Sequence, residues 1–201
     1  MFCNMISAIK KLSVVLVVSV SFATGAGATP IEFIYTGTGS GTIGVSTFSN
    51  ASFVITEQSD TSNIQSCGSC SFIDANSTSI SIGGIGSYLF TTGTRTFDAS
   101  GLVGFSRAGA GGVDLIDVFS VGSWNMISSI GPISQTVSLL QWGSPWPPVD
   151  TTGGVLSFND SSTSGTFQAI SGVPEPATYA MLLAGLGLIG FTTLRRKDFS
   201  A

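Results

Sequence analysis

Carboxylates are the side chains of this sequence best suited to acid–base chemistry, because the chain contains no histidine. The absence of histidine excludes Ser-His-Asp and Cys-His triads, imidazole bases and imidazole metal ligands. Glycoside hydrolysis, in contrast, needs only two carboxyl groups roughly 5–10 Å apart. The acids considered for such a pair are Glu32, Glu57, Asp98, Asp114 and Asp117.

The spacing of Asp114 and Asp117 argues against a local pair, since residues three positions apart on a regular strand point to opposite faces. We therefore expect the acids to be solvated surface or turn residues. A carboxylate pair assembled from distant strands is the alternative. The sequence contains no D-x-D-x-D-G calcium loop, so it predicts no metal site and no cofactor.

Cys67 and Cys70 stand in the segment Cys67-Gly68-Ser69-Cys70. In a cytosolic protein this spacing suggests a redox or metal site. Here no further metal ligands cluster around the two thiols, and the ends of the chain indicate export, as described below. The sequence predicts a disulfide that closes a small loop, as expected in an oxidising compartment. A redox-active disulfide is the alternative.

Trp142 and Trp146 lie in the segment QWGSPWPP at residues 141–148, where three prolines predict a loop. Indole rings exposed on a rigid loop suit stacking against a sugar ring. The favoured alternative is that both rings fold back as a lid over one end of the core. Binding of exopolysaccharide should change tryptophan fluorescence if the rings contact the sugar.

The central region, residues 29–172, has the size of one domain and alternates apolar and polar residues with a period of two. Turn residues separate the alternating runs, including Gly39, Asn50, Gly83-Gly84 and Gly153-Gly154. The alternating apolar residues include Ile31, Phe33, Tyr35, Ile43, Val45, Phe53, Ile55, Ile80, Ile82, Tyr88, Phe90, Val137, Leu139, Phe167 and Ala169. The pattern predicts an all-β, Ser/Thr/Gly-rich antiparallel β-sandwich or jelly roll. Residues 113–121 are expected to form a central strand that is buried on both faces.

Charge excludes one class of partner. Residues 29–172 contain nine acidic residues but only two bases, Arg95 and Arg107. Such an acidic surface repels phosphate backbones, so we expect no nucleic-acid partner.

The N-terminal residues 1–28 have the layout of a secretory signal peptide. Lys10 and Lys11 precede a short apolar run at residues 12–22, and Ala26-Gly27-Ala28 offers a small-residue cleavage site. An uncleaved anchor is the alternative, although the apolar run is short for a membrane span.

The C-terminal residues 177–194 are uncharged and long enough for a transmembrane helix. Three cations follow directly, Arg195, Arg196 and Lys197. Cations beside a span favour the cytoplasmic side, so the sequence predicts a helix whose N-terminal end faces outward. Residues 173–201 would then be a tail separate from the folded domain.

Val173-Pro174-Glu175-Pro176 immediately precedes this span. The order of motif, span and basic stop resembles the PEP-CTERM sorting proteins of Gram-negative bacteria. The resemblance covers about thirty residues. It implies recognition by a membrane-embedded exosortase, removal of the tail, and delivery to the cell surface or extracellular matrix. The chain would be held in the inner membrane by its C-terminal helix until it is processed.

The sequence therefore predicts an exported, non-enzymatic protein of the cell surface or extracellular matrix, either structural or associated with exopolysaccharide. The alternative is a secreted carbohydrate-active hydrolase that uses a carboxylate pair.

Overall fold

The computed structural model describes residues 29–109, 113–119, 121–172 and 185–186. The described part of the domain is built from β-strands, with one short 3-10 turn at Thr61–Asn63, so the all-β prediction is confirmed. The strands are β1 (Pro30–Ile43), β2 (Ser46–Asp60), β3 (Gln65–Ser66), β4 (Ser71–Asp74), β5 (Ser77–Ile82), β6 (Gly86–Leu89), β7 (Thr94–Ala99), β8 (Leu102–Arg107), β9 (Asp114–Val118), β10 (Ile130–Leu139), β11 (Val149–Thr151), β12 (Gly154–Phe158) and β13 (Ser162–Ser171).

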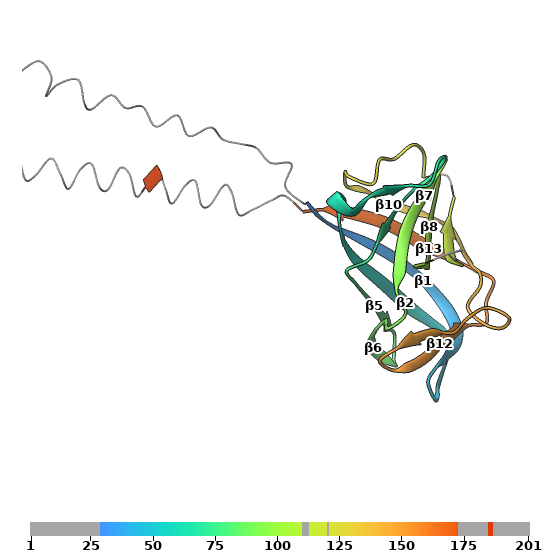
Figure 1. Ribbon diagram of the computed structural model, residues 1–201. Helices are drawn as coiled ribbons and strands as arrows, with labels where there is room; N and C mark the ends of the chain where they lie inside the picture. The colour runs from blue at the N-terminus through green and yellow to red at the C-terminus, as the bar shows by residue number, and fades with distance from the viewer. Residues whose placement is uncertain (1–28, 110–112, 120, 173–184, 187–201) are drawn as a thin grey trace, which may run out of the picture.

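All of these strands belong to one antiparallel sheet that curls over to form two facing layers (Figure 1). The hydrogen-bonded path runs β3-β4-β7-β8-β9-β10-β13-β1-β2-β5-β6, and β12 pairs with both β1 and β11. The predicted antiparallel, sandwich-like architecture is therefore confirmed in outline. The two layers are parts of one continuous sheet, whereas a classical sandwich has two separate sheets.

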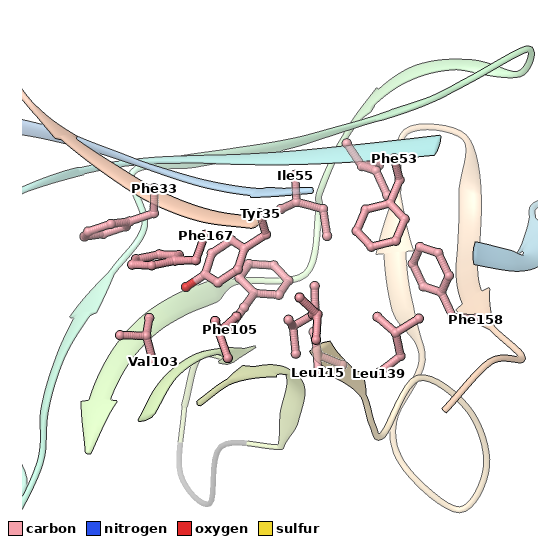
Figure 2. Close-up of a cluster of buried hydrophobic side chains, with 14 of the residues drawn as sticks. Phe33, Tyr35, Phe53, Ile55, Val103, Phe105, Leu115, Leu139, Phe158 and Phe167 are labelled. Carbon is pink, nitrogen blue, oxygen red and sulfur yellow. The ribbon is translucent and has the colours of Figure 1, made fainter. Parts of the chain in front are cut away.

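The core lies inside the curl and follows the predicted period of two. Phe33 and Tyr35 of β1, Ile55 of β2 and Phe167 of β13 all point inward and are fully buried (Figure 2). The ring of Tyr35 lies 5.6 Å from that of Phe105 in β8 and 5.1 Å from that of Phe167. Each such side chain contributes about 1.5–3 kcal/mol through burial of apolar surface, so this aromatic centre holds the two layers together.

The predicted central strand at residues 113–121 is found as β9, between β8 and β10, but it is shorter than expected. The first strand and the last strand are neighbours, and the start of β1 lies beside the end of β13 (Figure 1).

The predicted signal peptide, 1–28, lies outside the described residues. The same holds for the Pro-Glu-Pro motif, for the basic stop at 195–197, and for the predicted span at 177–194 apart from Gly185 and Leu186. Within the part of the chain that the structure describes, no helix has both the length and the hydropathy needed to cross a bilayer.

Candidate functional site

Trp142 belongs to the core. Its side chain is 1% exposed, and its ring packs against Phe105 and Phe158. Its indole Nε1–H donates a hydrogen bond to the carbonyl oxygen of Leu115 at 2.8 Å. The stacking role predicted for Trp142 is therefore contradicted, and its lid interpretation holds. Trp146 is 43% exposed, so only this indole of the loop remains at the surface.

Arg107, the last residue of β8, holds the loop at residues 141–148 in place. Its Nη2 donates to the carbonyl oxygens of Gln141, at 3.0 Å, and of Pro147. The side chain is buried, and desolvation lowers the pKa of its guanidinium. The charged guanidinium of Arg107 thus donates hydrogen bonds to backbone carbonyls of the loop, and its role is structural.

Trp124 is the tryptophan that lies at a pocket, and the sequence did not single it out. Its Nε1–H donates to the carbonyl oxygen of Ser128 at 2.9 Å, and its ring contacts Phe33 and Phe167 edge-on. These contacts anchor the ring, whose side chain remains only partly buried. Two hollows of about 430 and 310 Å³ share Trp124 and Ser123. We call them together the Trp124 pocket; its other residues include Ser69, Asp98, Ser100, Asn125 and Ser128.

Asp98 supplies a carboxyl group to the Trp124 pocket. Desolvation raises the pKa of this carboxyl, and its Oδ1 has no hydrogen-bond partner among the described residues. The pocket therefore combines an aromatic ring, several hydroxyl groups and a carboxyl group with unused hydrogen-bonding capacity.

The predicted disulfide between Cys67 and Cys70 is confirmed. The backbone N–H of Cys67 also donates to the carbonyl oxygen of Cys70 at 2.9 Å, which closes the loop tightly. Ser69, at the tip of this loop, lines the Trp124 pocket, while the two cysteines line a second hollow. The disulfide loop thus lies between the Trp124 pocket and this second hollow.

The second hollow, called here the disulfide pocket, has a volume of about 260 Å³ and lies on the outer face of β4, β7, β8 and β9. Besides the cysteines it is lined by Phe72, Arg95, Phe97, Ser106 and Asp114. The guanidinium of Arg95 lies 4.2 Å from the centre of the Phe72 ring, and its Nη2 pairs with Asp74 Oδ1 at 2.9 Å. Arg95 is therefore held in place by an ion pair and a cation–π contact.

Asp114 and Asp117 lie on the same face of β9, contrary to the prediction. Asp117 pairs with Gly104, and a shift of register between β8 and β9 brings Asp114 opposite Ser106. Because Gly104 and Ser106 are two positions apart on β8, both acids share the outer face. Desolvation, together with the negative charge of Asp114, raises the pKa of Asp117 to about 6. Desolvation also raises the pKa of Asp114.

Glu57 is completely buried, so the prediction of a solvated acid is wrong at this position. Its Oε2 accepts a hydrogen bond from the Thr96 hydroxyl at 2.7 Å, and its Oε1 has no partner among the described residues. The Thr96 hydroxyl lies 2.9 Å from the hydroxyl of Tyr35, which donates to the carbonyl oxygen of Gly104. Desolvation raises the pKa of Glu57 to about 8. This carboxyl lies inside the core, away from both pockets.

The remaining acid considered from the sequence, Glu32, lies near the start of β1, at the end of the sheet where β13 finishes. Across the described residues no three histidine, cysteine or acidic side chains are grouped so as to hold a metal ion.

Comparison with known proteins adds one match. A family model described as the PEP-CTERM protein-sorting motif matches residues 172–197. The chain carries a PEP-CTERM sorting motif. This confirms the resemblance of the Val173–Pro176 motif and of the basic stop, which both fall inside the match. The PEP-CTERM motif is the recognition signal of exosortase, so the chain is an exported protein that is sorted to the cell envelope or surface. No curated protein and no solved structure matches the chain.

Proposed function

We propose that the β-domain works outside the cell as a non-enzymatic module that associates with exopolysaccharide. In this proposal exosortase removes the tail near Pro174-Glu175-Pro176, and the processed domain enters the surface layer or extracellular matrix of a Gram-negative bacterium. The export step is supported by the PEP-CTERM match. The polysaccharide step is supported by a single observation, the composition of the Trp124 pocket.

The Trp124 pocket has the chemistry that a sugar requires. A sugar ring has an apolar face that packs on an aromatic ring, and hydroxyls around its rim that need donors and acceptors. Trp124 offers the ring, and Ser69, Ser100 and Ser123 offer hydroxyls that both donate and accept. Asp98 adds a carboxyl group, which accepts hydrogen bonds from sugar hydroxyls more strongly than a neutral group does.

Replacing Trp124 with alanine should lower the affinity for the host exopolysaccharide at least tenfold, because the stacking surface is lost. Replacing Asp98 with alanine should lower it by about fivefold without removing any core contact of Trp124. The measurement is titration calorimetry with the full chain. Trp146→Ala is the matched control, because Trp146 is exposed but lies outside the pocket, and its affinity should equal that of the unmodified chain. Unchanged affinity in both the Trp124→Ala and Asp98→Ala variants would contradict the proposal.

A second candidate, a carbohydrate-active hydrolase, is favoured by Asp114 and Asp117. The β-bulge puts both carboxyls on one face beside the disulfide pocket, and a pKa of about 6 for Asp117 suits a general acid. Two carboxyls on one face are the minimum for glycoside cleavage.

Release of reducing ends from the host exopolysaccharide separates the two candidates. We expect the unmodified chain to release none, as a binding module should. If the chain does release reducing ends, Asp117→Asn should lower the rate at least 100-fold, and Asp150→Asn, on an exposed acid of β11, should leave it unchanged. That pair of results would replace our proposal with the hydrolase.

A further inference from the structure

The sheet ends where the sorting motif begins. The family match starts at Gly172, whose N–H still donates a hydrogen bond to the carbonyl oxygen of Pro30 at 2.8 Å. In the sequence only Val173 separates Gly172 from Pro174-Glu175-Pro176. The motif therefore follows the paired sheet with almost no spacer.

The residues just before the motif have both backbone edges occupied. On one side, Ile170 and Ser171 of β13 pair with Glu32 and Ile31 of β1. On the other side, the N–H of Ser171 donates to the hydroxyl of Ser129 at 2.9 Å. An enzyme that reads an extended peptide does so through the peptide's backbone groups. In the folded domain the N–H groups of Ser171 and Gly172 are already hydrogen-bonded, and Ile170 is paired with Glu32.

This end of β13 is held by backbone hydrogen bonds but not by side-chain packing in the core. Ile170 lies on the outer face of β13 and is 42% exposed, and the last core residue of the strand is the buried Ala169, so no side chain of residues 170–172 fills the core. A pocket of about 400 Å³ beside Ile170, lined also by Glu32, Gln58 and Asn76, leaves that side chain without close packing. Residues 170–172 can therefore separate from β1 while the core stays closed, as strand ends commonly do.

We propose that the sorting enzyme binds residues 170–172 together with the Pro-Glu-Pro motif, and that it does so only after this end of β13 has left β1. Releasing the three residues in extended form gives the motif about 10 Å of additional reach. The end of β13 is thus part of the enzyme's recognition surface on this substrate. The inference rests on the proposed processing beside residues 174–176.

A disulfide that locks the end of β13 tests the inference in a cell that contains the exosortase. Glu32 and Ile170 are direct partners in the antiparallel register. Partners of this kind have Cα atoms about 4.5–5.5 Å apart, which suits a disulfide. Glu32→Cys with Ile170→Cys should reduce the processed fraction at least tenfold, measured by intact mass. The matched control, Thr36→Cys with Thr166→Cys, joins the same two strands further from the motif and should be processed normally.

A third chain adds six Gly/Ser residues between Gly172 and Val173 of the locked variant, and it should restore processing because the enzyme then has a free segment. Equal processing of the locked variant and its control, or no rescue by the insertion, would overturn the inference alone. If the unmodified chain is never processed, the proposed processing fails and the inference fails with it.

Discussion

Replacing Glu57 with glutamine is expected to remove a loss of stability that the unmodified protein shows as the pH rises. Burial raises the pKa of Glu57 from its usual 4.5 to about 8 in the folded protein. Between these values the unfolded chain releases the proton while the folded chain keeps it, so raising the pH favours unfolding. The contribution of Glu57 is thus fully present below about pH 4.5 and is lost as the pH approaches 8.

The expected size of this loss is large for a single side chain. One pKa unit corresponds to about 1.4 kcal/mol, so the whole change is worth roughly 4–5 kcal/mol. Asp117, with its pKa raised to about 6, adds a loss of the same sign at lower pH. Glu57 therefore dominates the interval from pH 6 to 8, where Asp117 completes its titration, and there the unmodified protein should lose about 2–3 kcal/mol.

Glutamine has the shape of the protonated glutamic acid and keeps an oxygen for the Thr96 hydroxyl. Urea unfolding at several pH values should show a nearly flat profile for Glu57→Gln between pH 6 and 8. Glu32→Gln removes the same charge from a partly exposed position of β1 and controls for the change in net charge. A Glu57→Gln profile as steep as that of the unmodified protein would show that the carboxyl is not buried as described.

The position of Glu57 could be predicted from the alternation of inward and outward residues along β2. Phe53, Ile55 and Glu57 occupy successive inward positions of β2, so the period of two places the carboxyl inside. The general rule that acids are solvated predicts the opposite. Strand geometry decides the outcome, because turning one residue outward would break the register of β2 with β1 and β5. The hydroxyl that compensates this burial, Thr96, comes from β7, a partner that the sequence does not reveal.

The face of β9 on which Asp114 lies is set by one extra residue, which forms a bulge in the pairing of β9 with β8. Leu115 and Ile116 are adjacent, and both are completely buried, which an unbroken strand of a one-sided core does not allow. From the sequence, the apolar character of residues 113–121 predicts a strand buried on both faces. The structure explains the apolar pair as a bulge opposite Phe105 and Ser106. Two adjacent apolar residues beside acids fit both explanations, so the sequence alone could not choose.

The sorting motif and the Trp124 pocket differ in how far apart their residues lie in the sequence. The sorting motif is a continuous segment, and its order of prolines, apolar run and cations could be predicted from the sequence alone. The Trp124 pocket draws Ser69, Asp98 and Ser123 from three separate segments. Only the pairing of β4 with β7, which sets Ser71 opposite Asp98, brings the first two together. A pocket of this kind is invisible before the strand order is known.

Replacing Trp142 with alanine should lower the free energy of unfolding by about 3–5 kcal/mol, the usual cost of removing a buried aromatic side chain. The indole fills the space between Phe105 and Phe158, and its N–H donates one of the two hydrogen bonds accepted by the carbonyl oxygen of Leu115 in the bulge of β9; the Leu140 N–H donates the other. Alanine would leave a cavity and would remove one of the two hydrogen bonds that the Leu115 oxygen accepts, while the bond from the Leu140 N–H stays. Urea unfolding of the full chain measures the loss.

Two further variants divide this loss of stability into its causes. One removes the hydrogen bond of Trp142 but keeps an aromatic ring, and the other removes a different ring of the same loop. Trp142→Phe keeps most of the apolar contact but removes one of the two hydrogen bonds to the Leu115 oxygen, so it should cost about 0.5–1.5 kcal/mol. Trp146→Ala, in the same loop but 43% exposed, should change stability by no more than about 0.5 kcal/mol. If Trp142→Ala instead kept full stability and lost affinity for exopolysaccharide, the indole would belong to a binding surface. Unchanged stability would show that the ring does not hold the core together, because a core ring cannot be removed without a loss of stability. The loss of affinity would then support the stacking role predicted from the Trp-Pro loop.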